Sequence, residues 1–158
     1  WPAGLPEESR ACTDLIHITD WLPTLLAACG IDSGPESDFD GMNVLPLLQG
    51  TGTITQIPRF WSWNYNFPSK DANTAMREDC WKLVRPFMLE ISGYSTQPAV
   101  DMEKIPAPFP LQLFRLDTDP YERNDVSSLF PERVKEMNIK MENWFEKVMY
   151  DFNDMIDW

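Results

Sequence analysis

The sequence has little glycine, one histidine and no long apolar run. No stretch approaches the ~18 consecutive apolar residues that mark a membrane-spanning helix, so we expect no membrane association. Seven glycines stand against 14 prolines, a balance that favours short elements joined by stiff loops. With 158 residues, of which 43% are hydrophobic and 13% aromatic, the chain can still bury the core of one domain or slightly more.

Basic residues are also scarce. The chain has 13 lysines and arginines against 25 aspartates and glutamates, which leaves a net charge of −12. Because nucleic-acid binding requires clustered basic side chains and these are scattered, we expect no nucleic-acid partner. A polyanionic substrate is disfavoured for the same reason. Salt screens charges beyond roughly 8 Å, so a local basic pocket is compatible with this composition, but no run of basic residues points to one.

Neither the three cysteines nor the single histidine forms a recognisable site. Cys12, Cys29 and Cys80 are odd in number and lack C-x-x-C spacing, which disfavours both a zinc site and a complete disulfide framework. We expect small buried thiols instead. His17 lies in an apolar, extended stretch (14–18) with no nucleophile at a suitable spacing. We therefore expect His17 to pack or to cap the following helix rather than to catalyse.

The first 50 residues predict a helical segment. Asp20 is a suitable N-cap, Pro23 falls in the first turn, and Gly30 suits the end of the helix. Together they predict a helix over 20–29. A second, short helix is predicted over 43–49, again closed by a glycine.

These two helices carry more leucine than so short a segment can bury against itself. We expect the segment 20–48 to expose an apolar patch, and patches beyond about a few hundred Å² usually mark a contact surface. The first 50 residues should then be loosely ordered, or buried through self-association or against a larger domain. The leucines concerned are Leu22, Leu25, Leu26, Leu45, Leu47 and Leu48.

The remainder predicts an α+β fold, a small antiparallel sheet of about four strands covered by a C-terminal amphipathic helix. The segments with strand character are 59–65, 73–86 (a hairpin of two strands) and 111–117. A proline-rich excursion, 87–110, interrupts them. The helix is predicted to begin at Pro131, since proline suits the first helical position. Its apolar face repeats every three or four residues and comprises Val134, Met137, Met141, Trp144, Phe145, Val148, Phe152 and Met155.

The segment DTDPYERND (117–125) concentrates acidic residues, as metal-binding and catalytic sites do. Counted from Asp117, a calcium loop would need an oxygen ligand, a glycine and a glutamate where the sequence has tyrosine, glutamate and serine. No nucleophile or base flanks the cluster either. Asp119 followed by proline starts a turn, because the aspartate side chain can accept hydrogen bonds from nearby backbone amides. We predict a structural corner in which Glu122 and Asp125 cap amides before the last helix.

The corner is also where the chain resembles a known family. LFRLDTDPYERNDV (113–126) resembles the motif L-Y-D-L-x-x-D-P-x-E-x-x-N-L near the C-terminus of sulfatases of the arylsulfatase family. Three further segments resemble that family in the same order, and the chain opens on a similar WPAGLP. They are TDWLPTLLAACGI (19–31) for D-L-x-P-T-L-L-x-L-A-G, DGMNVLPLLQG (40–50) for D-G-x-S-L-x-P-L-L-x-G, and AMREDCWKLVR (75–85) for A-V-R-x-G-x-W-K-L-I.

Two departures from the family pattern concern turns. Asp79 stands where the family has a glycine, and Asp125 where it has an asparagine. Both substitutions are tolerated in turns, because aspartate and asparagine share local hydrogen-bonding habits.

The resemblance implies a non-catalytic role for this chain. Sulfatases hydrolyse sulfate esters with a formylglycine, made from the cysteine of a C-x-P/S-x-R motif, beside a bound calcium ion. No cysteine here stands in that motif, so the resemblance implies a C-terminal part of a sulfatase with no catalytic and no metal-binding residue of its own. Residues 1–50 would end the catalytic domain, and residues 51–158 would form the C-terminal subdomain packed against that N-terminal catalytic domain. The parent would use calcium and formylglycine in a periplasmic, secreted or lysosomal compartment.

One loop has the composition of a sugar-binding segment. The stretch WSWNYNFPSKDAN (61–73) places amide, phenol and ammonium groups beside aromatic rings, which recognise sugars by hydrogen bonding and stacking. In sulfatases, loops of the C-terminal subdomain can rim the catalytic cleft. The alternative is that Trp61 and Trp63 belong to the core and that the loop after them is merely solvated. The candidate substrate-binding residues are Asn64, Tyr65, Asn66 and Lys70.

Two other functions are open from sequence alone. A free-standing carbohydrate-binding or protein-interaction module would show saturable glycan binding. An independent small hydrolase would turn over a chromogenic sulfate or phosphate ester, but the missing catalytic residues disfavour it.

Overall fold

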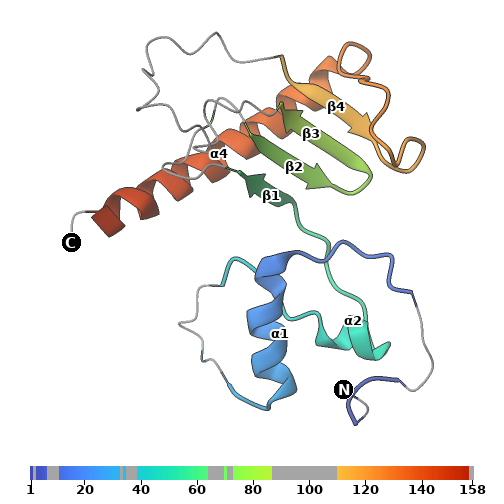
Figure 1. Cartoon of the computed structure of the whole chain (residues 1–158), viewed down its shortest axis with the longest axis vertical. Coiled ribbons are helices and arrows are strands. Elements are labelled where there is room, and N and C mark those ends of the chain that lie inside the picture. Colours follow the sequence, from blue (N-terminus) through green and yellow to red (C-terminus); the bar gives the residue numbers. More distant parts are fainter. Residues whose placement is uncertain are drawn as a thin grey trace, which may run out of the picture. The chain divides into compact units, whose positions relative to one another are not determined.

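The computed structural model describes residues 1, 3–6, 11–32, 34, 39–63, 70, 73–86 and 110–156, with side chains of the last helix up to Asp154. The chain divides into two compact units, Trp1–Ile57 and Pro58–Trp158. The described part of the first unit is helical. That of the second combines a four-stranded antiparallel sheet with one long helix (Figure 1). The predicted α+β fold class is confirmed.

The helices of the first unit lie within the predicted ranges. A 3-10 turn, η1 (Ile18–Asp20), leads into α1 (Trp21–Ala28), and α2 spans Leu45–Gln49. The predicted extended stretch 14–18 forms no strand, and its last residue already belongs to the 3-10 turn.

Two buried polar side chains tie the start of α1 to the chain before α2. The fully buried Asp20 carboxylate accepts hydrogen bonds from the backbone N–H groups of His17 at 2.7 Å and Met42 at 2.8 Å. The Thr24 hydroxyl accepts a third, from the Val44 N–H at 2.9 Å. The prediction that Asp20 caps the helix is therefore only partly right. Its side chain makes no capping bond to α1, because it closes the 3-10 turn and holds the distant chain instead.

Glycine is required at two points of this unit. A Cβ added at Gly41 would overlap the backbone carbonyl of Thr19, so only glycine lets the two segments approach so closely. Gly50 ends α2 with φ 70°, in the left-handed region that glycine adopts without strain. The first explains the glycine of the segment DGMN and the second confirms the predicted helix end.

The second unit is built on an antiparallel sheet in the order β1-β2-β3-β4 (Figure 1). The tight turn between the second and third strands places Asp79 at φ 52°. That left-handed conformation favours glycine but is open to aspartate, which accounts for the departure from the family pattern at this position. All predicted strands are present, some of them shorter than expected: β1 (Arg59–Ser62), β2 (Thr74–Glu78), β3 (Trp81–Arg85) and β4 (Gln112–Arg115).

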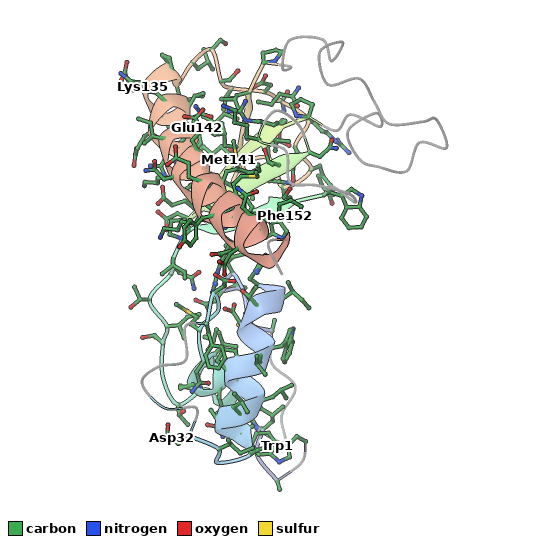
Figure 2. All side chains as sticks on the ribbon, turned by 90° about the vertical axis from the view of Figure 1, so that its left-hand side faces the viewer. Trp1, Asp32, Lys135, Met141, Glu142 and Phe152 are labelled. Carbon is green, nitrogen blue, oxygen red and sulfur yellow. The ribbon has the colours of Figure 1, made fainter. Side chains whose placement is uncertain are left out.

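Helix α4 (Pro131–Ile156) begins at the predicted residue and packs on one face of the sheet (Figure 1). Figure 2 shows Met141 on the side of α4 that faces the sheet and Lys135 pointing away from it. Side chains alternate between the two faces of a strand, so residues paired across neighbouring strands point to the same face. The paired residues of β2, β3 and β4 that point towards α4 form the core. The buried cluster comprises Met76, Leu83 and Leu113 from the sheet with Met137 and Met141 from the helix.

Further along α4 the packing becomes aromatic. Trp144 is half-buried and stacks on Phe60 of β1, with ring centroids 5.1 Å apart and planes 6° from parallel. Phe145 is buried beside it. The predicted apolar face of the helix is thus confirmed through these residues, while the side chain of Met155 lies outside the described part. None of the described helices combines the length and the apolar character that crossing a bilayer requires.

Candidate functional site

The acidic segment 117–125 is a structural corner, as predicted. One oxygen of the Asp119 carboxylate accepts hydrogen bonds from the backbone N–H groups of Arg123 and Asn124, both at 2.8 Å. The predicted amide-capping role is wrong for Glu122, which adopts a left-handed φ of 55° and whose carboxylate pairs with the Lys82 ammonium at 2.6 Å. The carboxylates are therefore engaged in holding the turn rather than gathered around a common point.

Asp125 closes the outer edge of β4. Its carboxylate accepts hydrogen bonds from the backbone N–H groups of Leu113 at 3.0 Å and Ser127 at 2.9 Å, while the Val126 N–H donates to the Leu113 carbonyl. Burial raises the pKa of Asp125, but these hydrogen bonds outweigh it and hold the pKa below its usual value. The predicted capping role is confirmed.

A second charged cluster joins β2 to α4. The Glu78 carboxylate, at the end of β2, pairs with Arg133 and Lys140, each at 2.8 Å, and both cations also pair with Glu136 at 2.9 Å. Hydrogen bonds from Lys140 and Arg133 lower the pKa of Glu136, and those to Glu78 and Glu136 raise the pKa of Lys140. Because every charge has a partner in this arrangement, the cluster is a structural clamp.

In the described part of the chain, the histidine makes a structural contact and two of the three cysteines are exposed. His17 caps the 3-10 turn, with its Nδ1 atom 2.9 Å from the Thr19 hydroxyl, which confirms the predicted capping role. The expectation of buried thiols is wrong for Cys12 and Cys29, which are exposed, while Cys80 is half-buried. Among the described residues, no group of three His, Cys, Asp or Glu side chains is placed to hold a metal ion.

The candidate sugar-binding loop is described only at its ends. Asn64, Tyr65 and Asn66 lie outside the described residues. Lys70 is exposed and borders an open depression whose other walls are Thr74 and Arg85 from the sheet and Met141, Glu142 and Phe145 from α4. Trp61 and Trp63 are 38% and 61% exposed, so the alternative that they are core residues is wrong.

An apolar face on α1 is exposed, as predicted. Leu22 and Leu25 are 56% and 55% exposed, and Ile18 and Trp21 beside them are exposed as well. We call these four residues the α1 face. The same prediction is wrong for Leu47, which is buried, because α2 packs against α1. The other three leucines, Leu26, Leu45 and Leu48, are half-buried.

A feature that the sequence did not indicate is a row of cations across the sheet. The strand register sets Arg59 of β1 opposite Arg77 of β2, and Arg77 opposite Lys82 of β3. The three side chains lie on the face opposite α4, since their neighbours Met76 and Leu83 face the helix. We call Arg59, Arg77 and Lys82 the cation row. The basic residues that are scattered in the sequence are thus partly gathered by the fold.

The comparisons with known proteins identify the relatives of this chain. No family model matches it. Mouse arylsulfatase J is 26% identical over 160 aligned residues that cover 84% of this chain, and arylsulfatase K of Xenopus laevis is 25% identical over 135 residues that cover 80%. The chain is homologous to sulfatases. It spans about a quarter of these relatives, 26% of the length of the first and 22% of the second.

Solved structures share the fold of this sulfatase homologue. A Bacteroides thetaiotaomicron protein, described with the metabolism of multiple glycosaminoglycans by that organism, superposes with a TM-score of 0.53 at 23% identity, over 80% of this chain and 24% of its own. The protein Ps i-CgsB superposes with a TM-score of 0.54 at 23% identity, over 80% of this chain and 23% of its own. At these identities the likeness concerns the fold.

Proposed function

We propose that this chain is the C-terminal, non-catalytic portion of a sulfatase whose full-length parent hydrolyses sulfate esters. The observation that carries the proposal is the homology to two arylsulfatases, of which the chain spans only about a quarter. Residues 1–50 are then the end of the catalytic domain and residues 51–158 the C-terminal subdomain. The division of the structure into units that meet between Ile57 and Pro58 supports a boundary near this point.

The residues present do not fit the catalytic groups of the family. No cysteine stands in a C-x-P/S-x-R motif, and the described residues gather no set of carboxylates for calcium. Formylglycine and calcium are therefore supplied by the part of the parent that this chain lacks. The charged side chains of the described part instead stabilise the corner at 117–125, the edge of β4 and the contact between β2 and α4.

The part of the chain that meets substrate is the loop after β1. Asn64, Tyr65, Asn66 and Lys70 contribute amide, phenol and ammonium groups, and a sulfated sugar is the ligand class that suits such groups. Trp61 at the end of β1 and Trp63 just after it are 38% and 61% exposed, which supports this, because sugars stack on aromatic rings that reach the surface. A structural relative described with glycosaminoglycan metabolism points to the same class.

The first unit is the attachment to the rest of the parent. The α1 face exposes four large apolar side chains, one from η1 and three from α1, and such faces mark contact surfaces. The partner is the N-terminal catalytic domain. In a chain separated from it, the same face promotes self-association.

Two measurements test the proposal. The gene sequence upstream of Trp1 should encode a C-x-P/S-x-R motif, and the full-length product should hydrolyse an arylsulfate that the 158-residue chain leaves intact. Turnover by the isolated chain, lost on changing Cys12, Cys29 or Cys80 to serine, would contradict the non-catalytic assignment.

A second candidate is a free-standing carbohydrate-binding module, favoured by the exposed tryptophans Trp61 of β1 and Trp63 just after it. It predicts saturable binding of a neutral or sulfated oligosaccharide by the isolated chain, weakened by Trp63→Ala. It also predicts that the upstream gene sequence carries no sulfatase motif. The upstream gene sequence and an oligosaccharide titration together distinguish the two functions.

A further inference from the structure

The face of the sheet opposite α4 combines charge with apolar area. The cation row crosses it, and the next register pair on the same face is apolar, with the half-buried Ala75 of β2 opposite the half-buried Val84 of β3. Trp61 follows on β1 and is 38% exposed. The described helix of this unit, α4, lies on the other face of the sheet (Figure 1). Arginine and tryptophan within apolar surroundings are the composition of protein–protein interface centres.

Three cations in adjacent register positions repel one another. Directly opposed side chains on neighbouring strands have Cβ atoms only about 4.5–5.5 Å apart, and like charges there destabilise a sheet. Lys82 is compensated by Glu122 at 2.6 Å. Arg77, in the middle of the row, bonds only to the Asp79 carbonyl at 3.4 Å, and no carboxylate of the described residues reaches it. The centre of the cation row therefore has a place for one more negative charge.

We propose that this face packs against the part of the sulfatase that the chain lacks, and that Arg77 pairs there with a carboxylate of that part. The inference rests on the proposed function, which requires a larger partner. A protein fits better than a glycan for two reasons. Arg59 is only 3% exposed, so this end of the row is already withdrawn from water, and a chain of net charge −12 repels a polyanion. One fixed carboxylate matches Arg77, which no carboxylate of the described residues compensates.

The test compares how Arg77 substitutions change the melting temperature of the isolated chain and of the full-length parent. We expect the change to have opposite signs in the two proteins. In the isolated chain, Arg77→Glu and Arg77→Met should leave the melting temperature unchanged or raise it, since they relieve repulsion within the cation row. In the parent, the same changes should lower the melting temperature by about 2–4 °C or more and make the chain more susceptible to limited proteolysis. Lys135→Glu is the matched control, because Lys135 is exposed on the outer side of α4 (Figure 2). It should behave alike in both proteins.

Each outcome has a distinct consequence. If the Arg77 variants destabilise the isolated chain as much as the parent, Arg77 has only a local structural role and the inference fails while the proposed function stands. If titration of the isolated chain with a heparin-derived disaccharide shows saturable binding that Arg77→Met abolishes, the face is a glycan site and the inference is overturned. If the upstream gene sequence encodes no sulfatase motif, the proposed function fails and the interface falls with it.

Discussion

Removing the indole of Trp144 tests the packing of α4 on the sheet. The ring stacks on Phe60 at 5.1 Å and meets Phe145 edge-on at 6.5 Å, so it joins β1 to the helix. Trp144→Ala deletes both contacts and leaves the Phe60 ring without its cover. The substitution should therefore destabilise the second unit without touching any polar network.

The size of the effect follows from burial. A large aromatic side chain that is fully buried costs ~3–5 kcal/mol when truncated to alanine. Trp144 is half-buried, so roughly half of that transfer free energy is at stake, and loss of the stacked pair adds about 0.5–1.5 kcal/mol. We expect Trp144→Ala to lower the free energy of unfolding by about 2–4 kcal/mol. Leu83→Ala, at a site with no exposure, should cost ~2–5 kcal/mol.

Urea denaturation followed by far-UV circular dichroism measures both changes. Trp63→Ala is the control, because a tryptophan that is 61% exposed should cost less than about 1 kcal/mol. The decisive result is the order of the three variants. If Trp63→Ala destabilised the chain as much as Trp144→Ala, the assignment of Trp144 to the helix–sheet interface would be wrong.

Three further predictions concern the corner, calcium binding and the α1 face. Because hydrogen bonding lowers the folded-state pKa of Asp125, its stabilising contribution is present above the unfolded pKa near 4 and is lost as pH falls through the folded value. Asp125→Asn should therefore lose less stability than the wild type between pH 6 and pH 3 in thermal melts, and an equal loss would refute this. Calorimetry should detect no tight calcium binding by the isolated chain, and micromolar affinity would contradict the prediction. The double substitution Leu22→Glu and Leu25→Glu should shift the chain towards monomer in light scattering. The buried Leu47 is the control, because Leu47→Ala should destabilise the chain instead. A wild-type chain that is strictly monomeric, with strong hydrogen-exchange protection of α1, would count against self-association.

Elements governed by local chemistry were predictable from the sequence. The start of α4 at Pro131, the end of α2 at Gly50 and the corner around Asp119 each depend on residues within a turn of one another. The alternation of side chains in β2 and β3 likewise needs only neighbouring positions. Such signals are strong because the physical cause and the residue that reports it lie in the same short segment.

Features that depend on distant pairing were not predictable. The residues around Asp20 predict a helix cap, yet its carboxylate accepts a hydrogen bond from the backbone amide of Met42, 22 residues away. Leu47 looked as exposed as Leu22 because both belong to short leucine-rich helices, and only the packing of α2 against α1 separates them. Of the candidate substrate residues, Asn64, Tyr65 and Asn66 lie outside the described residues, so their role stays a prediction.

The cation row shows why overall charge is a poor guide to the partners of a sheet protein. A net charge of −12 argues against a polyanion that approaches the whole surface. It says nothing of a single face, because register alone decides which charges stand side by side. The hairpin pairs Arg77 with Lys82, and the neighbouring strand adds Arg59. An acidic chain can thus present the cation row to a partner. We expect the partner's carboxylate at Arg77, which no carboxylate of the described residues reaches.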